Sequence, residues 1–173
     1  EEFEAFIDAQ ISSELRRESD YLFTLRLRDY LVEKAALKMP EAFLKRWLYT
    51  INEGKFSMEE IEKDFDQFLR MFTWNYLQKH FIKQDNLSVT KEEAEAEARA
   101  LAAAQFAQYG MPSAPEEMLA GYAKQILENK EQGQKIYEKL YEVKVVEDVK
   151  SKITVTEKAV SSDDFARMAS ELR

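Results

Sequence analysis

The 173-residue sequence contains no cysteine and a single histidine, His80. Without cysteine there is no disulfide, no thiolate-bound zinc, no iron–sulfur cluster and no cysteine nucleophile. One histidine also rules out a metal site built from several imidazoles and leaves little basis for a serine–histidine catalytic pair. The residue types on which metal binding and nucleophilic catalysis depend are scarce, so we expect no metal and no cofactor.

Glycine and proline are also rare, with four glycines and three prolines in the chain. A fold made of many short strands needs more turn residues than this. The 45% share of hydrophobic residues is at the same time too high for a disordered chain. No apolar run reaches the roughly 18 residues of a membrane span, and no basic segment followed by an apolar one marks a secretory signal. The composition predicts an all-α fold with long helices.

Acidic side chains outnumber basic ones by 33 to 25, which gives a formal net charge of -8. Duplex nucleic acid and anionic lipid surfaces carry the same sign of charge and would be repelled by the chain as a whole. We therefore expect neither nucleic acid nor a membrane among its partners.

Apolar residues at helical spacing and capping signals predict six helices. The first lies within residues 1–39, which contain neither glycine nor proline, and is about 35 residues long. In a capping box, two residues three apart each accept a hydrogen bond from the other's backbone N–H through their side chains. Such boxes are predicted for Ser57 with Glu60, Thr90 with Glu93 and Ser113 with Glu116. The second helix is predicted to begin at Pro40 and stop before Gly54, and the third to span residues 58–84. The fourth is predicted to run from Thr90 to Tyr109. The fifth is predicted to follow Ser113 as far as about Lys152, with a bend near Gly133, and the sixth to be capped by Ser162.

No arrangement of side chains predicts catalysis. There is no Gly-x-Ser-x-Gly motif and no glycine-rich phosphate loop, because the four glycines are isolated from one another. We interpret His80 as a partly buried histidine satisfied by a neighbour. The carboxylates of Glu92, Glu93, Glu95 and Glu97 surround a helix N-terminus and are interpreted as a solvated face. We expect no enzyme activity.

Large apolar side chains gather around the predicted turn at residues 110–115. Methionine and aromatic surfaces bind many different apolar partners, because methionine has three rotatable bonds and a polarisable sulfur. The same side chains could instead pack the two helices of the hairpin on each other, and the sequence leaves both readings open. The residues concerned are Phe106, Tyr109, Met111, Met118, Leu119 and Tyr122.

Five short stretches follow one another in a specific order along the chain. They are Leu31-Val32-Glu33-Lys34, Met39-Pro40-Glu41-Ala42-Phe43-Leu44, Asn52-Glu53-Gly54, Gln105-Phe106-Ala107-Gln108-Tyr109-Gly110-Met111 and Val155-Thr156-Glu157-Lys158. Taken in this order, they resemble the C-terminal chaperone domain of bacterial trigger factor over nearly the whole chain.

The resemblance implies an elongated all-helical body with a long linker helix and two protruding arms, forming a single domain over residues 1–173. It implies an ATP-independent chaperone of the bacterial cytoplasm that cradles unfolded or nascent polypeptides. The hairpin residues above would form a client site at an arm tip, and Phe68, Met71 and Phe72 would add contacts on another helix. The ribosome-docking signature Gly-Phe-Arg-x-Gly-x-x-Pro and an FKBP-like isomerase segment are absent, so ribosome docking and prolyl isomerisation are expected only of a longer parent protein.

An apolar client surface is costly to expose to water, so we expect a weak, micromolar homodimer in which the arms of one copy contact apolar surface of the other. Because the net charge opposes association, salt is expected to tighten such a dimer. Two alternatives use the same apolar helix faces. One is a structural or oligomerisation module, and the other is the helical body of a periplasmic parvulin-type chaperone.

Overall fold

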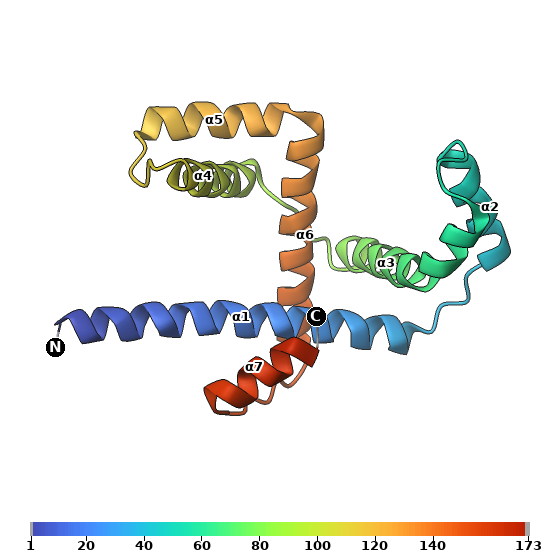
Figure 1. Ribbon diagram of the computed structural model, residues 1–173, viewed down its shortest axis with the longest axis horizontal. Coiled ribbons are helices and arrows are strands. Elements are labelled where there is room, and N and C mark those ends of the chain that lie inside the picture. The colour runs from blue at the N-terminus through green and yellow to red at the C-terminus, as the bar shows by residue number, and fades with distance from the viewer. Residues whose placement is uncertain (1, 172–173) are drawn as a thin grey trace. The chain divides into compact units, whose positions relative to one another are not determined.

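The computed structural model describes residues 2–171, which form seven α-helices and no strand (Figure 1). The predicted all-α fold is confirmed, whereas the elongated outline with protruding arms stays a prediction. The helices are α1 (Glu2–Ala35), α2 (Glu41–Ile51), α3 (Met58–Gln84), α4 (Lys91–Gln108), α5 (Glu116–Glu128), α6 (Lys130–Lys152) and α7 (Ser162–Glu171).

The chain divides into two compact units. Unit 1 comprises residues 1–77 and 155–173, and unit 2 comprises residues 78–154. The boundary falls within α3, so unit 1 contains α1, α2, most of α3 and α7. Unit 2 contains the end of α3 together with α4, α5 and α6.

The longest helix of unit 1 is α1, which runs for 34 residues without a break. At 1.5 Å per residue it is about 50 Å long. Its second half carries the buried side chains Leu22 and Leu27. Arg70 of α3 donates to Asp29 at 2.6 Å and joins the two helices in this region.

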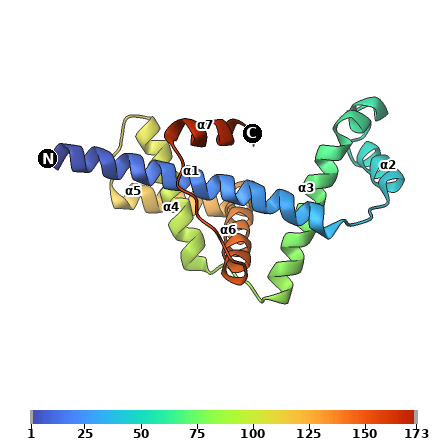
Figure 2. The same ribbon diagram turned by 90° about the horizontal axis from the view of Figure 1, so that it is seen from below.

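The helix α2 packs on the first half of α3 through one row of its apolar side chains (Figure 2). Leu44 is buried with Ile61 and Phe65 of α3. The chain leaves α2 through Gly54, whose φ of +71° lies in the left-handed region that favours glycine. The predicted stop at this glycine is confirmed.

Two of the predicted capping boxes are present. The Ser57 N–H donates to Glu60 Oε2 at 2.8 Å, and the Glu60 N–H donates to Ser57 Oγ at 3.2 Å. Thr90 and Glu93 make the same reciprocal pair at the start of α4, also at 2.8 and 3.2 Å. These local signals predicted the starts of α3 and α4 correctly.

The prediction of one long helix after Ser113 is wrong, because the chain breaks at Asn129 into α5 and α6. Asn129 has extended backbone angles (φ -73°, ψ 115°), and its side chain accepts hydrogen bonds from the N–H groups of Glu131 and Gln132. An asparagine that caps a new helix in this way competes with continuation of the old one. The expected bend near Gly133 is thus a full break four residues earlier.

Two predicted caps are also corrected. Pro115, rather than Ser113, is the N-cap residue of α5, and no side chain caps it. The carboxylate of Glu116 instead accepts a hydrogen bond from Arg99 of α4. At the start of α7 the capping hydroxyl belongs to Ser161, which accepts from the Asp164 N–H at 3.2 Å, one residue earlier than the predicted Ser162.

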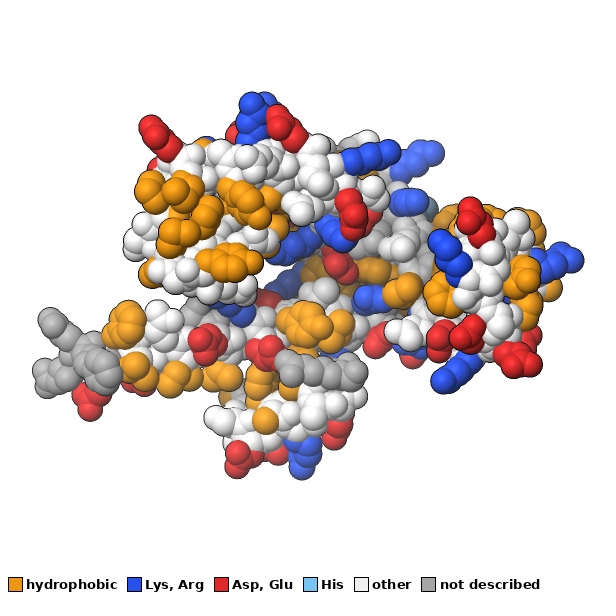
Figure 3. Space-filling model, turned by 45° about the horizontal axis from the view of Figure 1, so that its top comes forward, with side chains coloured by type: hydrophobic (Ala, Val, Ile, Leu, Met, Phe, Trp, Pro, Cys, Tyr) orange, Lys and Arg blue, Asp and Glu red, His pale blue; other side chains and the backbone are white. Residues whose placement is uncertain are grey.

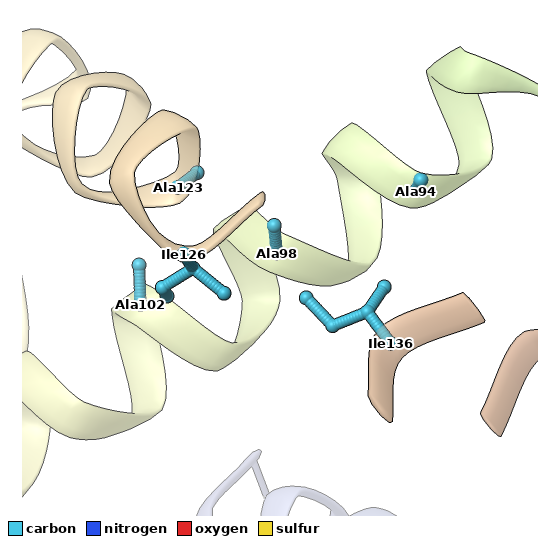
Figure 4. Close-up of a cluster of buried hydrophobic side chains, with 6 residues drawn as sticks. All are labelled: Ala94, Ala98, Ala102, Ala123, Ile126 and Ile136. Carbon is cyan, nitrogen blue, oxygen red and sulfur yellow. The ribbon is translucent and has the colours of Figure 1, made fainter. Parts of the chain in front are cut away.

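The core of unit 2 is built on a row of alanines in α4 (Figure 4). Ala94, Ala98 and Ala102 are each completely buried, and they recur every four residues on one side of the helix. Such small side chains let α5 and α6 approach closely, and Ile126 and Ile136 from those helices complete the cluster. The alanine-rich sequence of α4 is therefore a packing surface.

Ion pairs along α6 add to this packing. Lys144 donates to Glu93 at 2.7 Å, and Lys139 donates to Glu97. The interpretation of these two carboxylates as part of a solvated face is therefore wrong, since both pair with a neighbouring helix. The prediction of a partly buried His80 is also wrong, because its side chain is exposed.

Candidate functional site

The free end of the α4–α5 hairpin is held in place by a glycine-dependent helix stop. Gly110 has a φ of +81°, and its N–H donates to the carbonyl of Ala107 at 3.1 Å. The N–H of Met111 donates to the carbonyl of Phe106 at 2.9 Å. These two bonds form a Schellman motif, which fixes the direction of the chain after α4. The backbone that carries Tyr109 and Met111 is thus well determined.

Two of the predicted site residues pack the hairpin together. The rings of Phe106 in α4 and Tyr122 in α5 meet edge to face, with centroids 5.5 Å apart and an interplanar angle of 64°. The Tyr122 hydroxyl donates to Gln105 Oε1 at 2.8 Å. Leu119, also half-buried, contacts the alanine-based core. For these residues the packing interpretation holds, although each keeps part of its surface accessible.

Three other predicted residues lie on the outside of the hairpin. Tyr109 is 82% exposed, Met118 is 46% exposed and Met111 is 43% exposed. In Figure 3, hydrophobic side chains gather on this end of the α4–α5 hairpin. Large apolar side chains at such exposure add nothing to the core, so these three are the ones available to a partner.

A shallow pocket lies between the packed and the exposed residues. It has a volume of about 160 Å³ and is lined by Gln105, Phe106, Tyr109 and Tyr122. A cavity of about 150 Å³ lined by apolar side chains holds one benzene ring. The pocket is therefore of a size to take one apolar side chain of a bound peptide. The Gln105 amide and the tyrosine hydroxyls of the lining offer hydrogen bonds to the backbone of that peptide.

The second predicted group, on α3, divides in the same way. Phe68 and Phe72 are half-buried and continue a series of ring contacts from Phe65, with centroid distances of 5.9 and 5.8 Å. Both pack against the α2–α3 core. Met71 is 45% exposed and is the member of the group that faces solvent most openly.

An exposed apolar row on α2 was not predicted from the sequence. Phe43, Trp47 and Ile51 are exposed by 56%, 41% and 51%. Leu44 and Leu48 form the adjacent row that packs on α3. Two adjacent apolar rows on an 11-residue helix cannot both face one neighbour, and that crowding was the available signal.

Within residues 2–171 no group of three His, Cys, Asp or Glu side chains is arranged to hold a metal ion. None of the helices in this range is long and apolar enough to cross a membrane.

Residues 19–169 match a protein-family model described as the probable C-terminal domain of trigger factor. The match includes the whole α4–α5 hairpin, all of α2 and α3, and the five stretches that carried the resemblance in the sequence. No curated protein and no solved structure matches the chain.

Proposed function

Since the chain belongs to the family of trigger factor C-terminal domains, we propose that it binds unfolded or nascent polypeptides without ATP and assists their folding. Membership of this family indicates a chaperone-like role, and the domain is the chaperone part of trigger factor rather than its isomerase part. What the proposal adds is client binding and the surface that performs it.

The observation that carries the proposal is the exposure of Tyr109, Met111 and Met118 on a rigid support. The Schellman motif and the Phe106–Tyr122 contact hold the hairpin end in one conformation. Little conformational entropy of the backbone is then lost when a client segment binds. A single-side-chain pocket beside three adaptable apolar groups suits short apolar segments of varied sequence.

Binding of this kind is weak at each contact and gains strength from repetition. Met71, Phe68 and Phe72 on α3 supply a second contact region on the same chain. Two weak contacts on one flexible client raise the overall affinity through effective concentration, while each alone still dissociates quickly. A chaperone without an energy source needs that property to release its client.

Suppression of client aggregation tests the proposal. The wild-type chain at several-fold molar excess should slow the aggregation of a chemically unfolded client, and the triple variant Tyr109→Ser/Met111→Ser/Met118→Ser should lose most of this effect. A matched control is Tyr137→Ser/Val143→Ser, which removes two exposed apolar side chains from α6. We expect the control to behave as wild type.

Thermal unfolding of all three proteins completes the experiment. The substituted side chains are exposed, so their melting temperatures should agree closely. If the triple variant suppresses aggregation as well as wild type, the hairpin is not the client site. If the wild-type chain has no effect and forms a stable oligomer instead, the structural-module alternative is favoured.

The proposal also includes the extent of the domain, its cellular location and its partners. We place residues 1–173 in one chaperone domain of a cytoplasmic protein, with contact to the ribosome made only through a domain outside this sequence. We also propose a weak homodimer, because apolar side chains on the arms are covered at low energetic cost by a second copy.

A further inference from the structure

The connection between α6 and α7 is the longest non-helical segment of the described chain, and Figure 2 shows it as a thin trace between these helices. It begins at Ile153, whose backbone angles are extended (φ -119°, ψ 160°). From Thr154 to Ser161 the chain makes no turn or bend, and no residue in this stretch has a positive φ. We call residues 154–160 the extended segment. In the manner of a β-strand it spans roughly 23 Å.

The backbone of the extended segment is unpaired within the described chain. No backbone hydrogen bond joins the N–H or C=O groups of residues 154–160 to any other group in residues 2–171. Every residue of the segment is exposed. A row of backbone donors and acceptors is therefore accessible to another molecule.

The described chain cannot supply a strand to pair with this row. Residues 2–171 form helices and no strand, and the other connections between these helices are shorter than the one after α6. The next longest, residues 109–115, contains two prolines, which lack a backbone N–H. A pairing partner has to come from outside the described residues.

The side chains of the extended segment suit a strand. Four β-branched residues, the type most favoured in strands, follow one another: Ile153, Thr154, Val155 and Thr156. The segment contains no proline and no glycine. Glu157 and Lys158 cancel each other in charge, and charged residues of this kind are typical of strands that lie at the open edge of a sheet. The segment therefore has the character of an edge strand without a sheet.

The chemistry of this segment favours an unfolded polypeptide as its partner. A regular row of backbone N–H and C=O groups is matched along its length only by another extended backbone. Such pairing does not depend on the partner's side chains, and the segment has no net charge with which to select them. Folded proteins protect their strand edges, whereas an unfolded chain offers its backbone throughout its length.

We propose that the extended segment binds clients by strand addition, in which an extended, proline-free stretch of an unfolded polypeptide pairs its backbone with residues 154–160. The inference rests on the proposed client binding and adds a backbone contact to the side-chain contacts of the α4–α5 hairpin. Only every second residue of a strand directs its N–H and C=O toward a given edge. A seven-residue segment thus makes few hydrogen bonds, so the contact stays weak enough to release the client.

Amide exchange with solvent, measured by NMR, tests the pairing directly. The probe is a reduced and carboxymethylated protein that stays unfolded in buffer. When it binds, exchange should slow by about tenfold or more at either the even-numbered or the odd-numbered residues of 154–160, and the amides between them should stay fast. Slowing at none of these residues, or equal slowing at successive residues, overturns strand addition.

Proline variants remove the donors of one edge at a time. Thr154→Pro/Thr156→Pro affects one edge and Val155→Pro/Glu157→Pro the other. The double variant on the paired edge should bind the probe about fivefold more weakly than wild type, or worse, because each lost N–H leaves a client carbonyl unpaired. Both proline variants binding as wild type would contradict the proposal.

Two further sets of variants separate the backbone from other effects. Alanine at the same pairs of positions keeps the N–H groups, so on the paired edge the alanine variant should bind about threefold more tightly than the proline variant, or better. Equal losses in the two would overturn backbone pairing. Lys38→Pro/Ser88→Pro is the proline control, because it removes two N–H groups that have no backbone partner in residues 2–171 from exposed positions in other connections. It should bind the probe as wild type.

The results distinguish this inference from the proposed function. If the wild-type chain neither slows aggregation nor binds the probe, the proposed function itself is overturned. If it slows aggregation while exchange in the extended segment is unchanged, only strand addition is overturned. Alternating slow exchange that appears without the probe and increases with protein concentration would assign the segment to pairing with a second copy and would likewise overturn the client as its partner.

Discussion

A β-carbon added to Gly133 would lie 2.7 Å from the carbonyl oxygen of Leu127. The contact crosses the break between α5 and α6, because Leu127 belongs to the last turn of α5 and Gly133 to the first turn of α6. Backbone atoms cannot move away as a flexible side-chain end can. The absence of a side chain at this glycine is therefore what lets the chain turn at Asn129.

Substitution of Gly133 by alanine should destabilise the chain. Alanine gains about 1 kcal/mol over glycine inside a helix, but overpacking against rigid neighbours costs about 1–3 kcal/mol, so we expect a net loss of up to about 2 kcal/mol. Gly121→Ala is the matched control, because Gly121 lies within α5 with no atom within 4 Å of the added carbon. That variant should gain about 0.5–1 kcal/mol. Urea unfolding compares the two, and equal effects of the same sign would contradict the steric argument.

The serines of the predicted capping boxes should differ in their effect on stability. Ser57 accepts the Glu60 N–H, so Ser57→Ala should lower the free energy of unfolding by about 1 kcal/mol. Ser113 caps no helix, and Ser113→Ala should stay within about 0.5 kcal/mol of wild type. Chemical denaturation of both variants decides the point. A loss at Ser113 as large as that at Ser57 would mean that the hairpin turn has another conformation in solution.

These two serines show what the sequence could predict. Where a signal is local, as for the boxes at Ser57 and Thr90 or the stop before Gly54, the helix boundary was predicted correctly because neighbouring residues alone satisfy the backbone. At Ser113 the same spacing gave a wrong cap, because Glu116 pairs with Arg99 across the hairpin. The decisive partner there is distant in sequence.

The sequence was sufficient to place the end of the α4–α5 hairpin, but not to predict which of its side chains are buried and which are exposed. The spacing of Phe106, Tyr109 and Tyr122 located a hairpin end rich in aromatic residues. Which rings pack and which face water depends on the rotation of α4 against α5, and that rotation is set by the buried alanines of α4. The exposed row on α2 was missed for the same reason, since only packing on α3 separates Phe43 from Leu44.

In the α3 group, substitution of a half-buried residue should lower the free energy of unfolding more than substitution of the exposed one. Phe72 packs on the α2–α3 core, so Phe72→Ala should cost about 1–3 kcal/mol. Met71 is exposed, and Met71→Ala should change stability by less than about 0.5 kcal/mol. Thermal unfolding measures both. If they prove equally destabilising, Met71 is covered in solution by something other than its own unit.

Glu93 should make the stability of unit 2 depend on pH. The Lys144 ammonium and the Thr90 N–H both donate to this carboxylate and lower its pKa below the ordinary value. Folding therefore favours the ionised form. The stabilisation is complete above the unfolded-state pKa of about 4.3 and is lost as the pH falls through the lower folded-state pKa.

The variant Glu93→Gln isolates this effect, because the amide oxygen can still accept the Thr90 N–H but carries no charge for Lys144. At pH 7 the variant should melt at a lower temperature than wild type, and the difference should shrink as the pH is lowered from 5 toward 3, where the wild-type carboxyl becomes neutral as well. Glu92→Gln is the control, since Glu92 is exposed beside it and forms no ion pair with a described residue. A difference between Glu93→Gln and wild type that is constant from pH 7 to pH 3 would show that the Lys144 ion pair contributes nothing to holding α4 on α6.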